Sequence, residues 1–182
     1  NLSDASEKVD FRTATLQGLG RGKGLFFPEH IPSFPGEWIS KIDAYSNEEI
    51  ALSVLRPYVG ETIPAKVLEK IVAETIAFDI PLVEVSKNIF SLELFHGPTL
   101  AFKDVGARFM SRCLGYFMRG NPKPVTVLVA TSGDTGGAVA NGFFNVEGVR
   151  VVILYPSGKV SSVQELQLTR LGNNITALEI NG

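Results

Sequence analysis

The stretch that decides the fold is residues 125–137, Val-Thr-Val-Leu-Val-Ala-Thr-Ser-Gly-Asp-Thr-Gly-Gly. Its first six residues are β-branched or apolar throughout, a composition typical of a strand buried on both faces of a parallel sheet. A glycine-rich turn follows at 131–137, and the small residues of 138–144 favour a helix directly after it. A strand, a turn and a helix in this order predict one unit of an α/β fold.

The alternation continues on both sides of this unit. Four more apolar runs predict strands, the first two of them paired as a hairpin, and two stretches with helical spacing predict helices, the second of which ends at a glycine. The predicted elements are a hairpin at 82–85 and 89–95, a helix at 104–119, a strand at 149–154, a helix at 162–171 and a strand at 175–180. We therefore expect a parallel three-layer αβα sheet in residues 81–182.

Residues 1–80 carry helix signals instead. Asp10 is placed to cap a first short helix, Ser46 and Glu49 form a capping box, and Pro64 opens a third helix. The predicted fold class is thus α/β, with a helical N-terminal region followed by a partial α/β domain.

The turn after the strand at 125–130 has two open interpretations. Unpaired backbone N–H groups and the helix dipole make such a turn an anion site, and Ser132 and Thr135 could add hydroxyl donors. Alternatively, Asp134 or Thr135 caps the helix and binds nothing. The glycine spacing does not fit a dinucleotide fingerprint or a P-loop.

Residues 96–104, His-Gly-Pro-Thr-Leu-Ala-Phe-Lys-Asp, supply the best candidate for chemistry. Lys103 follows three apolar residues, and a lysine amine becomes a nucleophile where a partly dry setting disfavours its ammonium form. The alternative is a solvated surface lysine, since most lysines are exposed. Asp104 lies where the N-cap of the next helix is expected.

Composition excludes several classes of function. The chain has 182 residues, of which 45% are hydrophobic and 20% charged, with a net charge of −2, so it is globular and offers no field for nucleic acid or an anionic membrane. We expect no metal site, because the two histidines, His30 and His96, lie far apart. The lone Cys113 lies on an apolar helix stripe, which favours a packed thiol and a reducing, cytoplasmic setting.

The motifs at 96–104 and 131–136 together resemble threonine synthase, a pyridoxal-phosphate enzyme of fold type II. The resemblance extends to Gly-Leu-Phe-Phe-Pro at 24–28 and to Tyr-Pro-x-Gly-Lys-x-Ser-x-x-Gln-Glu at 155–165. These four motifs occur in order along nearly the whole chain. The fold implied by the resemblance is an incomplete fold type II architecture.

The resemblance implies a role for each motif residue. Lys103 would hold pyridoxal 5'-phosphate covalently and move protons during turnover, with Phe102 and Asp134 beside the cofactor. Ser132, Gly133, Thr135 and Gly136 would bind the substrate carboxylate, and Lys159 and Ser161 would face the substrate phosphate. Residues 162–165, Ser-Val-Gln-Glu, also read as a capping box, which gives that motif a purely structural alternative.

The implied reaction converts O-phosphohomoserine and water to threonine and phosphate. Two alternatives stay open: another fold type II enzyme, such as a hydroxy amino acid dehydratase, and a non-catalytic protein that binds a phosphorylated metabolite. The chain begins at Asn1 and ends just after a predicted strand, so we expect it to be an N-terminal piece of a longer enzyme. Without the cofactor-phosphate loop of the family, this piece should be inactive alone and bind the cofactor weakly or not at all.

Overall fold

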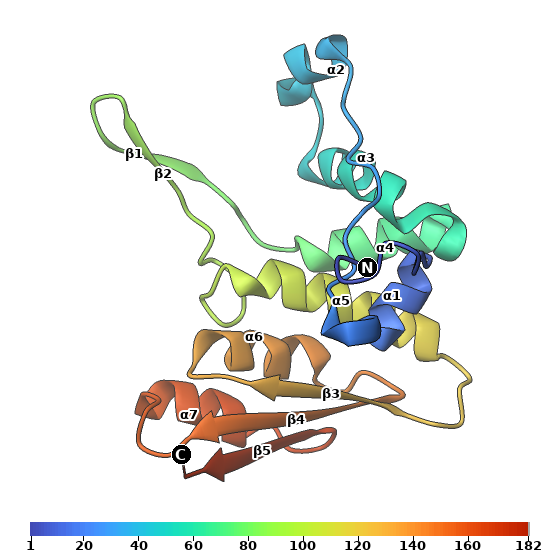
Figure 1. Ribbon diagram of the computed structural model, residues 1–182. Coiled ribbons are helices and arrows are strands. Elements are labelled where there is room, and N and C mark those ends of the chain that lie inside the picture. The colour runs from blue at the N-terminus through green and yellow to red at the C-terminus, as the bar shows by residue number, and fades with distance from the viewer. Residues whose placement is uncertain (182) are drawn as a thin grey trace. The chain divides into compact units, whose positions relative to one another are not determined.

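A computed structural model describes residues 1–181 (Figure 1). The chain divides into two compact units, and the boundary along the sequence falls between Ile76 and Ala77. The first unit is helical and the second is α/β, the order of classes expected from the sequence.

The first unit is built from capped helices. Its helices are α1 (Phe11–Gln17), α2 (Gly36–Ser40), α3 (Asn47–Val59) and α4 (Ala65–Thr75), with 3₁₀ turns η1 (Arg21–Lys23), η2 (Ile42–Ala44) and η3 (Gly60–Thr62). Asp10 caps α1 by accepting from the Thr13 N–H, and the capping box of Ser46 and Glu49 starts α3. Pro64 precedes α4. All three predicted helix starts are confirmed.

The second unit opens with a hairpin. Strands β1 (Leu82–Ser86) and β2 (Ile89–Leu92) pair antiparallel, as predicted, although β2 ends three residues earlier than expected. The hairpin projects away from the sheet and helices of this unit (Figure 1). Its large apolar side chains are consequently exposed.

The remainder of the second unit is the predicted alternation of helices and parallel strands. The elements are α5 (Lys103–Met118), β3 (Val125–Ala130), α6 (Asp134–Phe143), β4 (Val149–Pro156), α7 (Ser162–Thr169) and β5 (Ile175–Ile180). The strands are parallel in the order β3-β4-β5, with Val127 opposite Val151 and Val151 opposite Ile175. The α/β class is confirmed.

One face of this sheet carries the core. Helices α5 and α6 pack against β4, α7 packs against β5, and α5 and α6 pack on each other. Val151 and Ile153 point to this side and are fully buried, whereas Leu128 on the opposite side is 67% exposed. The prediction that residues 125–130 are buried on both faces is therefore wrong for the described residues, because a strand alternates its side chains and the described helices cover one side.

Helix α5 buries one of its faces against α6. Cys113 is buried, as its place on an apolar stripe predicts, together with Leu114, Phe117 and Met118, whereas Met110 is 42% exposed. Close contact with α6 is possible because Gly142 has no side chain: a Cβ there would lie 3.1 Å from the Ala107 carbonyl carbon. The buried face of α5 thus includes the small residues Ala107 and Ser111 and leaves Met110 partly outside.

Burial should shield the single cysteine from reagents. Cys113 is fully buried, and burial raises the pKa of its thiol from 9.0 to about 12. At pH 8, we expect the Cys113 thiol to react with a disulfide reagent at least about a hundredfold more slowly in the native chain than in urea. The reason is that a buried thiol can react only during a rare local opening of the structure. Equal rates in the two states would contradict the packing of α5.

The free energy of unfolding should also fall as the pH rises from about 9 to about 12, since the Cys113 thiol ionises at a lower pH in the unfolded chain than in the folded one.

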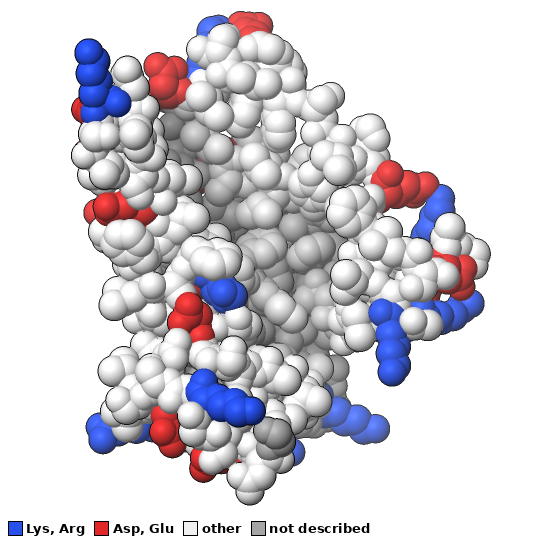
Figure 2. Space-filling view, turned by 60° about the vertical axis from the view of Figure 1, so that its left-hand side comes forward, with Lys and Arg blue, Asp and Glu red and all other residues white. Residues whose placement is uncertain are grey.

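On the face shown in Figure 2, basic and acidic side chains stand singly or in mixed pairs. No helix within residues 1–181 is long and apolar enough to cross a membrane.

Candidate functional site

The three sequence motifs of the second unit, at 96–104, 131–136 and 155–165, lie at one edge of the sheet. Strands β3 and β4 point their carboxyl ends to the left in Figure 1, and α5, α6 and α7 begin at that same side. Lys103 is the first residue of α5, Asp134 is the first residue of α6, and Ser161 is the N-cap of α7. Open α/β sheets bind their ligands at this edge, because the connecting loops and helix N-termini converge there.

Thr131 shapes the turn between β3 and α6. Its Oγ1 accepts hydrogen bonds from the N–H groups of Gly133 and Gly136, at 3.1 and 3.0 Å. A Cβ at Gly136 would lie 2.4 Å from the Thr131 Cγ2, so glycine is needed there for the threonine to fit. The alternative interpretation, a cap by Asp134 or Thr135, is wrong: α6 follows Gly133 without a side-chain cap. The role of Thr131 was not predicted, although a hydroxyl residue directly after a predicted strand was a usable signal.

Three N–H groups of the turn remain available. Within the described part of the chain, the backbone N–H groups of Ser132, Asp134 and Thr135 have no acceptor, and all three residues are exposed. Gly133 between them has a φ of +153°, a backbone conformation that side chains rarely adopt. Exposed N–H groups at a helix start are a suitable site for an anion such as a carboxylate.

Replacing Thr131 by Val should test the shape of this turn. The valine keeps the volume but removes the acceptor of two N–H groups, so we expect a loss of about 1–3 kcal/mol in the free energy of unfolding. Thr131→Ser, which restores the oxygen, is the matched control. Unfolding can be followed by urea-dependent labelling of Cys113, which lies in the same unit. A valine variant as stable as the serine variant would show that Thr131 does not hold the turn.

Lys103 lies at the end of a constrained loop. It is half-buried, and its Nζ is 4.4 Å from the centre of the Phe102 ring. Phe102 itself is 61% exposed. Leu100 in the same loop has a φ of +59°, which is uncommon for a residue with a side chain. The lysine is therefore presented on an irregular segment with one aromatic face beside it.

Asp104 holds that loop and does not cap the helix. Helix α5 begins at Lys103 with Phe102 as its N-cap, so the expected cap at Asp104 is wrong. The Asp104 carboxylate is 1% exposed and accepts from the Thr99 N–H at 2.9 Å and the Thr99 hydroxyl at 2.6 Å. A buried carboxylate requires such donors, and the folded loop supplies them.

A polar network joins the starts of α6 and α7. Gln164 Nε2 donates to Asp134 Oδ1 at 2.8 Å, and Gln164 Oε1 accepts from the Ser161 hydroxyl at 2.9 Å. Ser161 and Gln164 form the capping box of α7, one residue earlier than the predicted box at 162–165. The backbone N–H of Lys159 donates to the Pro156 carbonyl at 3.3 Å in the preceding turn.

Within these residues, Lys103 contacts Phe102, and Asp134 contacts Gln164. Among the described residues, no hydrogen bond or ion pair joins Lys103 to the turn at 131–136. The predicted site residues thus share one edge of the sheet but form two separate sets of contacts.

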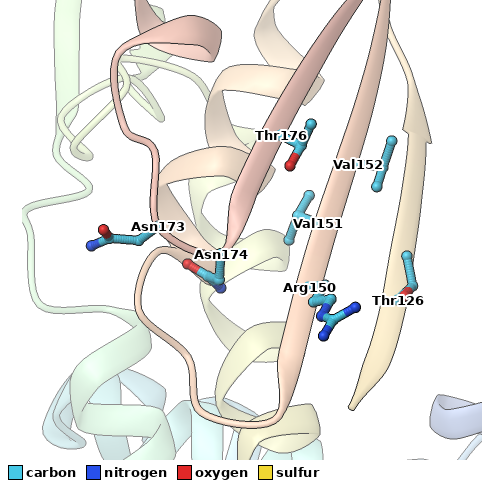
Figure 3. Close-up of a pocket in the computed structure, with 7 residues that line it drawn as sticks. All are labelled: Thr126, Arg150, Val151, Val152, Asn173, Asn174 and Thr176. Atoms are coloured by element: carbon cyan, nitrogen blue, oxygen red, sulfur yellow. The ribbon is translucent and has the colours of Figure 1, made fainter.

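A hollow in the surface lies away from the motifs. It has a volume of about 620 Å³, and its lining includes Thr126, Arg150 and Thr176, near the amino ends of the strands (Figure 3). Asn174, which also lines the hollow, has a structural role, because its Nδ2 donates hydrogen bonds to the Phe143 and Val149 carbonyls. The hollow therefore lies at the opposite end of the strands from Lys103 and Asp134.

A parallel sheet with a lysine and a glycine-rich turn at its carboxyl edge defines the class, an open α/β protein whose loops and helix starts converge at one edge of the sheet. Residues 3–76 match the family described as threonine synthase N terminus. The whole chain is 45% identical to the threonine synthase of Escherichia coli. The threonine synthase of Schizosaccharomyces pombe is 37% identical to it over 97% of the residues of this chain. The matches span 42% and 37% of those two relatives.

Solved structures agree with the sequence comparisons. The crystal structure of threonine synthase from Escherichia coli superposes with a TM-score of 0.92, covering this whole chain and 42% of that one. The PLP-bound threonine synthase from Brucella melitensis gives a TM-score of 0.86 at 42% identity, over 96% of this chain and 39% of its own. This chain is homologous to the N-terminal region of threonine synthase, and it spans about two fifths of the length of these relatives.

Proposed function

We propose that this chain forms the lysine-bearing part of a threonine synthase, a pyridoxal-phosphate-dependent carbon–oxygen lyase that converts O-phosphohomoserine and water to threonine and phosphate. One observation carries the proposal: Lys103 and the turn at 131–136 lie at the carboxyl edge of the parallel sheet, in a chain that is 45% identical to a threonine synthase over all of its own 182 residues. We further propose a cytoplasmic location, on the evidence of the single buried Cys113.

The residues present fit the cofactor. Lys103 offers an amine for a carbonyl group, and the Phe102 ring beside it offers an apolar face to a flat heterocycle. Asp134 offers a carboxylate with one oxygen engaged by Gln164. Pyridoxal phosphate, when bound, withdraws electrons from the carbon atoms next to the substrate amino group.

The protein groups have distinct tasks in the proposed reaction. The N–H groups of Ser132, Asp134 and Thr135 bind the substrate carboxylate, with the glycines at 133 and 136 allowing close approach. Lys103 Nζ removes the proton from the substrate α-carbon and returns protons later in the reaction. Lys159 supplies positive charge beside the substrate phosphate, and Ser161 lies in the same segment.

A labelling experiment tests the proposal. The full-length enzyme is mixed with pyridoxal 5'-phosphate, reduced with borohydride and digested, and the modified peptide is identified by mass spectrometry. We expect the label on Lys103 and release of phosphate from O-phosphohomoserine. Serine and threonine as substrates distinguish the dehydratase alternative. A label on another lysine, or binding of O-phosphohomoserine without turnover, would overturn the proposal.

A further inference from the structure

One glutamine connects two neighbouring loops at the carboxyl edge of the sheet. Gln164 Oε1 accepts from both the N–H and the hydroxyl of Ser161, at 3.2 and 2.9 Å. Because two donors fix the oxygen end of the amide, its NH₂ end is held on the other side, where it donates to Asp134 Oδ1 at 2.8 Å. The amide therefore has one defined orientation.

The same amide lies directly over the glycine of the turn. A Cβ at Gly133 would be 2.4 Å from Gln164 Nε2 and 2.8 Å from its Cδ, closer than any side chain tolerates. Glycine at this position thus allows Gln164 to reach Asp134. Gly133 also has a φ of +153°, so even Gly133→Ala should strain the backbone and displace the amide.

The hydroxyl of Ser161 is fully engaged by this network. Its one proton is donated to Gln164 Oε1, and its oxygen accepts from the Gln164 N–H at 3.3 Å. A phosphate dianion accepts hydrogen bonds and needs donors. In this arrangement Ser161 has no proton left for a phosphate, but it does fix the residue that contacts Asp134.

We infer that Gln164 is a positioning residue of the site, which holds one oxygen of Asp134 so that the other faces the ligand, and that Ser161 acts through Gln164. The inference rests on the proposed function, because Asp134 is proposed to lie beside the cofactor. The network also couples the segment that carries Lys159 to the turn at 131–136. A change in either loop is therefore transmitted to the other.

The network is tested first in the 182-residue chain, without cofactor. In nitrogen-15 spectra, the side-chain amide signals of Gln164 should move in the Asp134→Ala and Ser161→Ala variants. Gln167 is the matched control: it lies one turn further along α7, against Gly137, and its amide signals should stay in place. Unmoved Gln164 signals in both variants would overturn the network.

The positioning role is tested by steady-state kinetics of the full-length enzyme. We expect Gln164→Ala to lower kcat by about tenfold, the worth of one hydrogen bond to a charged group, with little change in the KM for O-phosphohomoserine. Ser161→Ala should behave similarly, the double variant should be no worse than Gln164→Ala, and Ser161→Thr should retain activity. A raised KM for Ser161→Ala that persists in the Gln164→Ala background would instead show direct phosphate contact by Ser161.

One further variant separates positioning from helix capping. Gln164→Glu keeps the acceptor of the capping box, since glutamate is favoured there, but it cannot donate to Asp134 when ionised. We expect it to be as impaired as Gln164→Ala. A fully active Gln164→Glu enzyme would overturn the positioning role of Gln164 but leave the proposed function intact. A wild-type enzyme that is inactive on O-phosphohomoserine would overturn both the proposed function and this role.

Discussion

Full-length enzyme carrying Lys103→Ala is expected to lose at least about a thousandfold in the rate of phosphate release from O-phosphohomoserine. The reason is that Lys103 is proposed both to hold the cofactor and to move the proton at the substrate α-carbon. Lys103→Arg keeps the positive charge and much of the length, but a guanidinium does not release its proton near neutral pH. It should therefore be as inactive as the alanine variant.

The fold should survive these substitutions. Lys103 is half-buried at the first position of α5, and no ion pair or hydrogen bond to its amine is present among residues 1–181. Lys123→Ala, at an exposed position before β3, is the control and should retain activity. Turnover near the wild-type rate in Lys103→Ala would remove the pyridoxal-phosphate assignment and leave the metabolite-binding alternative.

Asp104→Ala is expected to have the largest effect on stability, about 3 kcal/mol in the free energy of unfolding. The substitution removes a buried carboxylate and leaves the N–H and hydroxyl of Thr99 without their acceptor. A cap at the start of α5 would have been worth about 1 kcal/mol. Urea-dependent labelling of Cys113 measures this loss in the correct unit, since the single tryptophan, Trp38, lies in the other one.

Two further variants define the origin of that loss. Gly97→Ala should destabilise the same unit, because the added Cβ would lie 2.6 Å from Asp104 Oδ2 and 2.9 Å from its Cβ. Asp79→Ala, at an exposed position in the same unit, should change stability by less than about 0.5 kcal/mol. An Asp104→Ala variant that loses no more than the Asp79→Ala variant would show that the loop before Lys103 is held by other contacts.

The sequence located the candidate site because its signals are local. Lys103 lies next to three apolar residues, and the turn at 131–136 has its glycines within a few positions, so neighbours along the chain reveal both. The strands at 125–130 and 175–180 were predicted with their observed bounds for the same reason. Roles that depend on residues distant in sequence were missed: Gln164 contacts Asp134 across 30 positions.

The sequence by itself determined the α/β class and the order of the elements, because periodicity and turn residues act over short stretches of chain. The tertiary structure alone decided what several polar side chains do. Asp104 accepts a hydrogen bond from Thr99, and Thr131 accepts from two N–H groups of its turn. The capping box of α7 begins at Ser161, one residue before the predicted position. A polar side chain bonds to whichever partner the folded chain brings within about 3 Å, and that choice is set by packing, which sequence spacing does not encode.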